Sequence, residues 1–137
     1  MLFYVAIVRP LGKVITWVTD WFDGAHTACF LDKLRQKLKG WRIDLVWDRA
    51  SWHRGTEVEE ALTRNRLHSH KLPPYSPEMN AAEPWIRWAK ETLSANTCWD
   101  DRTSLVRAFN GFAVSMTRRA SEVLQRCVPN MLGFNCQ

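Results

Sequence analysis

Apolar runs in the first third of the chain predict a hairpin, a helix and a strand, in that order. Residues 2–8 and 14–21 are rich in β-branched and aromatic side chains, and residues 9–13 between them include a proline and a glycine. This combination is typical of a β-hairpin. Apolar residues then recur at helical spacing over 30–38, and residues 43–47 form a short apolar run that predicts a buried strand. The order predicts a parallel partner strand after a crossover.

The pattern of the remaining chain predicts three helices and one short strand. Helices are expected over residues 57–65, 80–95 and 101–119, and a strand over residues 68–72. Thr56 and Glu59 form a capping-box signature for the first helix, and Asn80 is a suitable N-cap for the second. Residues 121–127 either extend the last helix or form a short separate element.

Length and charge narrow the class of protein. With 137 residues, we expect one domain over residues 1–128 and a loose tail over residues 129–137. Lys and Arg number 19 against 14 Asp and Glu, which gives a net charge of +5 and favours contact with nucleic-acid phosphates. The four cysteines are widely spread, so we expect reduced thiols and no structural zinc. The apolar opening is too short to span a membrane, and we expect a cytoplasmic protein.

Asp48 directly follows the predicted strand at 43–47. Open α/β sheets bind their ligands outside the carboxyl ends of the strands, which makes this carboxylate a candidate for chemistry. The other interpretation is a turn residue that opens the next loop. Asp44 shares the face of Asp48 by strand alternation, but it lies four residues back and too far to share a ligand.

Glu83 lies in the first turn of the helix expected from Asn80. A capping box between Asn80 and Glu83 would give this glutamate a purely local role. The preceding segment, residues 72–80, reads LPPYSPEMN and is rich in proline. Prolines stiffen an extended segment and fix where the helix begins, so that the Glu83 carboxylate would point back towards the sheet.

The sequences around the two acids are specific enough to suggest a family. Asp48 lies within WDRASWH (residues 47–53), Glu83 follows LPPYSPEMN, and the intervening residues 49–82 number 34. These features resemble the DDE transposases, specifically the mariner-related branch of bacterial insertion sequences, whose last two catalytic acids follow an Asp-(34)-Glu spacing. The resemblance implies an α/β fold of RNase H-like type, a mixed sheet flanked by helices. It also implies that Asp48 and Glu83 bind Mg²⁺, for which Mn²⁺ can substitute, and that the protein cuts and joins DNA.

Basic residues near the two acids are candidates for contact with DNA. The set comprises Arg49, His53, Arg54, Arg87 and Lys90. His53 matches a histidine of the family five residues after the acid, although a partly exposed loop histidine is the other interpretation. Arg87 and Lys90 follow Glu83 by four and seven residues and share its helical face, where ordinary solvated charge is the alternative. Arg49 and Ala81 depart from the family, which usually has Asn and Pro there.

The first catalytic acid of the family has no counterpart in this chain. In the family it lies on a first strand before the hairpin, so the resemblance implies that the chain lacks that strand and an N-terminal helix-turn-helix. We expect a domain that is inactive alone and self-associates, as a homodimer or with the missing N-terminal transposase portion, through an exposed sheet edge. Its other partners would be DNA at transposon ends and target sites, in the nucleoid. The alternative is a non-catalytic remnant that binds nucleic acid or serves assembly.

Overall fold

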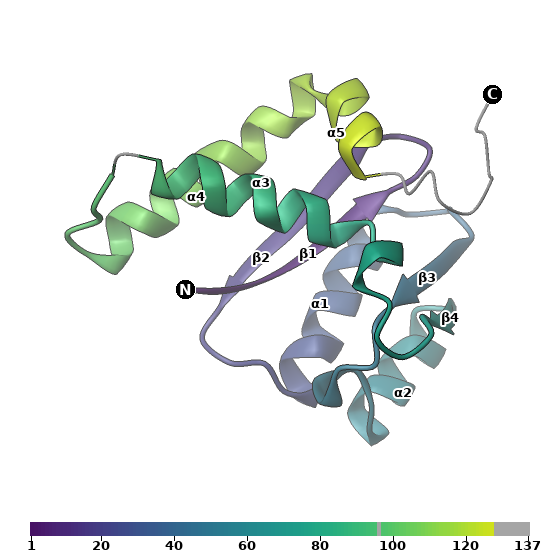
Figure 1. Ribbon diagram of the computed structural model, residues 1–137. Helices are drawn as coiled ribbons and strands as arrows, with labels where there is room; N and C mark the ends of the chain where they lie inside the picture. Colours follow the sequence, from purple (N-terminus) through teal and green to yellow (C-terminus); the bar gives the residue numbers. More distant parts are fainter. Residues whose placement is uncertain (96, 128–137) are drawn as a thin grey trace. The chain divides into compact units, whose positions relative to one another are not determined.

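The chain begins with two strands, alternates helix and strand in its middle and ends with three helices, in an α/β fold (Figure 1). This computed structural model describes residues 1–95 and 97–127. Its elements are β1 (Leu2–Val8), β2 (Lys13–Thr19), α1 (Gly24–Lys37), β3 (Ile43–Trp47), α2 (Thr56–Arg64), β4 (Leu67–Lys71), α3 (Ala82–Ser94), α4 (Arg102–Ser115) and α5 (Ala120–Cys127). They divide into two units. The hairpin unit contains β1, β2 and the chain from Ala81 on, and the central unit spans Thr19–Asn80.

The hairpin unit is a two-stranded sheet covered by helices. β1 and β2 pair with each other, and the four residues between them are enough only for an antiparallel turn. The ring of Phe3 on β1 lies 4.5 Å from that of Phe109 on α4, measured between centroids. The buried cluster between sheet and helices consists of Trp85, Trp88, Ala89, Phe109, Phe112, Met116, Val123 and Cys127. Burial of these large apolar side chains is the main source of stability for this unit.

The central unit is built around a parallel strand pair. β3 and β4 run in the same direction, in register from Ile43 opposite Leu67 to Trp47 opposite Lys71. Parallel neighbours need a long connection, and α2 supplies it. α1 packs against α2, and a bidentate ion pair from Arg64 to Asp32 at 2.9–3.0 Å joins the two helices at the surface. β3 is thereby paired with β4, and β4 in turn contacts α2.

The α/β class and the order of the elements predicted from the sequence are confirmed. The strand at 43–47 has the expected bounds, and its parallel partner β4 follows a helical crossover. It is not the buried strand that the sequence predicted, because Asp44 and Val46 are exposed and only Trp47 is buried. In the described residues the four strands form two separate two-stranded sheets and are not joined into one mixed sheet. α5 is a helix distinct from α4, and the tail expected over 129–137 lies outside the described residues. In the part of the chain that the structure describes, no helix is long and apolar enough to cross a membrane.

Two predicted helix caps are wrong. The N-cap of α2 is Gly55, at φ 112°, and Thr56 is already helical, so no capping box forms. Glycine reaches this φ without strain, and the helix therefore begins one residue earlier than a threonine cap would allow. Asn80 does not cap α3 either, because its amide donates to the carbonyl of Pro77 at 3.0 Å and closes a 3₁₀ turn, Pro77–Met79. Ala81 is the N-cap and contributes no side-chain bond.

Gly12 in the β1–β2 turn provides a test of the hairpin unit. It has φ 71°, and a Cβ built there would collide with the backbone carbonyl of Ala120 on α5. We expect Gly12→Ala to lower the free energy of unfolding by roughly 2–4 kcal/mol, through left-handed strain and this clash. Gly40→Ala is the control, because Gly40 has φ 79° but nothing within 4 Å, and it should cost only about 1 kcal/mol. Urea titration of the two variants would decide, and equal losses would contradict the close packing of the turn on α5.

Candidate active site

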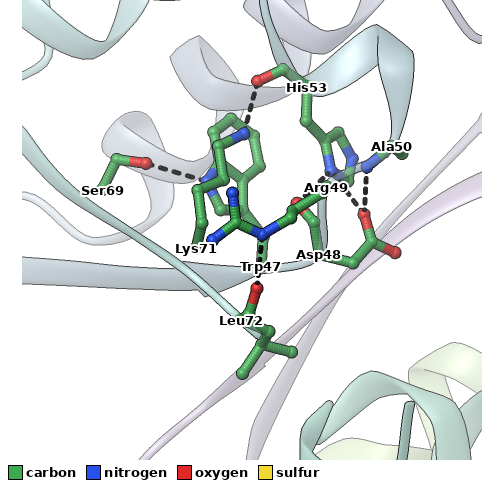
Figure 2. Close-up of polar contacts among 8 residues, drawn as sticks. All are labelled: Trp47, Asp48, Arg49, Ala50, His53, Ser69, Lys71 and Leu72. Carbon is green, nitrogen blue, oxygen red and sulfur yellow. Dashed lines mark hydrogen bonds and ion pairs between the residues drawn. The ribbon is translucent and has the colours of Figure 1, made fainter. Parts of the chain in front are cut away.

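Asp48 lies immediately beyond the carboxyl end of β3, with 49% of its side chain exposed. Its Oδ1 accepts the backbone N–H of Ala50 at 2.9 Å, so the carboxylate stabilises the turn that follows the strand. The turn interpretation of Asp48 is therefore confirmed, and it does not use the second carboxylate oxygen. Only one of its two oxygens is used in this way, and Figure 2 shows Oδ2 directed away from the Ala50 amide.

His53 provides a second donor to the same oxygen. His53 is the last residue of the 3₁₀ turn Ser51–His53. This turn places its ring beside Asp48, with 2.9 Å between His53 Nδ1 and Asp48 Oδ1 (Figure 2). Only 15% of the His53 side chain is exposed, and its ring stacks on that of Trp47 with 4.5 Å between centroids and 15° between planes. Burial lowers the pKa of His53, and the negative charge of Asp48 partly opposes this shift. The sequence suggested a partly exposed loop histidine or a DNA contact, whereas the structure places the imidazole against the carboxylate.

Trp47 and Lys71 both contact His53, Trp47 through its ring and Lys71 through the His53 carbonyl. The indole Nε1–H of Trp47 donates to Ser69 Oγ at 2.8 Å, and the ammonium of Lys71 lies 4.4 Å from the centroid of the Trp47 ring, within cation–π range. The same ammonium donates to the carbonyl of His53 at 2.8 Å. Sequence reasoning missed Trp47, Ser69 and Lys71 as parts of the site. The pairing of Trp47 with Lys71 depends on the β3–β4 register, which apolar periodicity alone does not fix.

Positive charge gathers around Asp48. Arg49 is exposed and donates from Nε to the carbonyl of Leu72 at 2.9 Å, and Arg54 is exposed just after the 3₁₀ turn. Burial is the largest cause that lowers the pKa of Lys71; the charges of Glu59 and Asp48 raise it, and those of Arg49 and Arg54 lower it. Cations and carboxylates therefore both lie around Lys71, and its positive charge is available to a phosphate ester.

Glu83 belongs to the hairpin unit, where it is partly exposed in the first turn of α3. Because Ala81 is the N-cap, Glu83 is the second helical residue, and the capping box with Asn80 is absent. A carboxylate there is favoured by the positive end of the helix dipole. Arg87 and Lys90 are exposed on the same helix, four and seven residues later, as the sequence indicated. Asp48 and Glu83 therefore lie in different units.

The donors suit a hard divalent cation. Mg²⁺ binds carboxylate oxygens and keeps several waters, so that one or two carboxylates and a substrate phosphate complete its shell. Asp48 offers Oδ2, and Glu83 offers a partly exposed carboxylate. Asp44 is committed elsewhere, because His70 lies 3.0 Å from its Oδ1 and Arg42 3.5 Å from its Oδ2. In the described ranges, no three His, Cys, Asp or Glu side chains gather into a ligand group.

Asp48 lies beyond the carboxyl end of a parallel strand, which is where open α/β sheets bind their ligands. The family model described as DDE superfamily endonuclease matches residues 3–106, which include both Asp48 and Glu83. The match covers more than half of the chain, and the chain belongs to this family. Membership indicates a transposase-type nuclease with a DNA substrate, and nucleases of this superfamily generally use divalent metal ions. No curated protein matches the chain.

Proposed function

We propose that this chain is the catalytic domain of a mariner-related bacterial insertion-sequence transposase, with an RNase H-like arrangement of its strands. It would hydrolyse phosphodiesters at transposon ends and then transfer the strand to target DNA. The observation that carries the proposal is the position of Asp48. Its carboxylate is fixed beyond β3 with one oxygen free of the local turn, inside a family match that also includes Glu83.

Asp48 and Glu83 would hold Mg²⁺ or, in its place, Mn²⁺. Bound metal would activate the attacking water or 3′-hydroxyl and stabilise the leaving oxygen. Around Asp48, the exposed guanidinium groups of Arg49 and Arg54 would bind DNA phosphates and set the position of the strand. Arg87 and Lys90 would do the same along α3, one and two turns beyond Glu83.

A second candidate is a module that binds DNA without cutting it. One observation favours it: no three metal-ligating side chains come together within residues 1–95 and 97–127. The basic surface would then account for the whole function, and Asp48 would serve its turn alone. The two candidates differ in whether bound DNA is cut, which makes them separable by experiment.

Metal removal tests the leading proposal. The full chain, supplied with the N-terminal transposase portion that is expected to carry the first catalytic acid, would be incubated with supercoiled plasmid DNA, which requires no knowledge of the terminal repeats, and with Mg²⁺, Mn²⁺ or EDTA. We expect nicking with either metal and none with EDTA, together with binding in gel-shift assays that weakens steeply as salt is raised.

Each alternative gives its own pattern in the same assay. DNA binding without nicking under any metal would support the non-catalytic module. Nicking that persists in EDTA would argue against a carboxylate-held metal. A chain that neither binds nor nicks DNA would contradict both candidates.

A further inference from the structure

The Asp48 carboxylate is held more firmly than its exposure would suggest. A half-exposed aspartate at the end of a strand ordinarily samples several rotamers. Here two nitrogens each lie 2.9 Å from Oδ1, the donating Ala50 amide and His53 Nδ1, and Nδ1 is also 3.4 Å from the Asp48 carbonyl oxygen (Figure 2). Two hydrogen bonds to one oxygen fix the plane of the carboxylate and leave Oδ2 as the outward ligand atom.

The His53 ring is itself fixed. It lies flat on Trp47, and the edge of Trp52 approaches at 5.9 Å between centroids and 79° between planes. With 15% of its side chain exposed, the imidazole has little surface with which to reach a DNA strand. Because the His53 imidazole is mostly buried and faces Asp48, it can orient the Asp48 carboxylate but has little surface to contact a substrate directly.

Strand β4 holds the base of this arrangement. Ser69 accepts the indole N–H of Trp47, so the ring on which His53 rests cannot rotate freely. Lys71 lies over that indole and also donates to the His53 carbonyl, which ties the 3₁₀ turn to β4. The order of support therefore runs from β4 through Trp47 to His53 and then to Asp48.

We infer that His53 is a positioning residue, which orients Asp48 Oδ2 towards a divalent cation by donating from Nδ1 to Oδ1, with Trp47 as its platform. The inference deepens the proposed function and rests on it, since it takes Asp48 as a metal ligand. Partners that orient a ligating side chain typically change metal affinity by about 10–100-fold when they are removed. His53 would then act on metal binding without touching the DNA.

Two substitutions of His53 distinguish hydrogen-bond donation to Asp48 from stacking of the ring on Trp47. His53→Phe keeps an aromatic ring to stack on Trp47 but has no donor, whereas His53→Asn keeps an N–H near the position of Nδ1 but cannot stack. Mn²⁺ binding to the full chain would be measured at fixed pH by electron paramagnetic resonance, with no DNA present and with folding checked by circular dichroism. We expect the Phe variant to lose about 10–100-fold in Mn²⁺ affinity and the Asn variant to recover most of it.

Asp48→Asn, measured in the same titration, separates failure of this inference from failure of the proposed function. If Asp48→Asn weakens Mn²⁺ binding while the folded Phe variant binds as the wild type does, the positioning role alone is overturned. Equal losses for Phe and Asn would also overturn it, in favour of simple packing. Wild-type Mn²⁺ binding that is absent, or unchanged by Asp48→Asn, would overturn the proposed metal site and this inference with it.

Discussion

Replacing Asp48 by Asn is expected to abolish metal-dependent cleavage of DNA while leaving DNA binding and folding nearly unchanged. The amide keeps an oxygen that can accept the Ala50 N–H, so the turn after β3 should persist. It loses the negative charge that attracts a divalent cation. Metal ions supply several kcal/mol of transition-state stabilisation in phosphoryl chemistry, which corresponds to a rate loss of at least about 100-fold. Plasmid nicking in Mn²⁺, with gel-shift binding in parallel, measures both halves of this prediction.

Asp44→Asn is the matched control for Asp48→Asn. Asp44 lies on β3, four residues before Asp48, and its replacement removes the same charge, but its carboxylate faces His70 and Arg42 at the surface. We expect its nicking rate to stay within about threefold of wild type, because exposed ion pairs contribute little. If both variants lose activity to the same extent, the effect is one of net charge and the special role of Asp48 is contradicted. If neither does, the proposed catalytic acid is wrong.

Elements with strong apolar periodicity were predictable, and the ends of helices were less so. The strand at Ile43–Trp47 is apolar except for Asp44, and its bounds follow from that short run. The starts of α2 and α3 depend instead on backbone conformation at Gly55 and on a 3₁₀ turn before Asn80. Capping-box signatures at Thr56 and Asn80 were present in both places, yet local turn geometry decided where each helix begins.

The acids of the candidate site could be predicted from the sequence, but the residues that contact Asp48 and His53 could not. Asp48 could be placed because it directly follows a predicted strand, and open α/β sheets bind their ligands beyond the carboxyl ends of their strands. The contacts of Trp47 with Ser69 and Lys71 follow from how β4 aligns with β3, a relation between segments more than 20 residues apart. In sequence, a histidine five residues after an acid has no fixed direction. The 3₁₀ turn gives His53 that direction, and only the folded chain contains it.

Trp85→Ala is expected to have the largest effect on stability. Trp85 has no exposed surface, and its ring lies 5.4 Å from that of Phe112 and 5.9 Å from that of Phe109, between centroids. Truncation of a buried tryptophan leaves a cavity and costs about 3–5 kcal/mol, which is a large fraction of the 5–15 kcal/mol that stabilises a typical domain. Since Trp85 follows Glu83 by two residues on α3, its loss should also disturb the helix that carries this acid.

Trp85→Phe distinguishes the contribution of the buried apolar ring from that of the indole N–H. Among the described residues, the buried Nε1–H of Trp85 meets no acceptor, and an unpaired buried donor costs about 1–3 kcal/mol. Phenylalanine removes that donor and keeps most of the apolar volume, so we expect it to be at least about 2 kcal/mol more stable than alanine in urea titrations. Trp21→Ala, at a residue with 68% exposure, should change stability by less than about 1 kcal/mol. Similar losses for Trp21→Ala and Trp85→Ala would contradict the assignment of Trp85 to the core, because burial is what distinguishes the two rings.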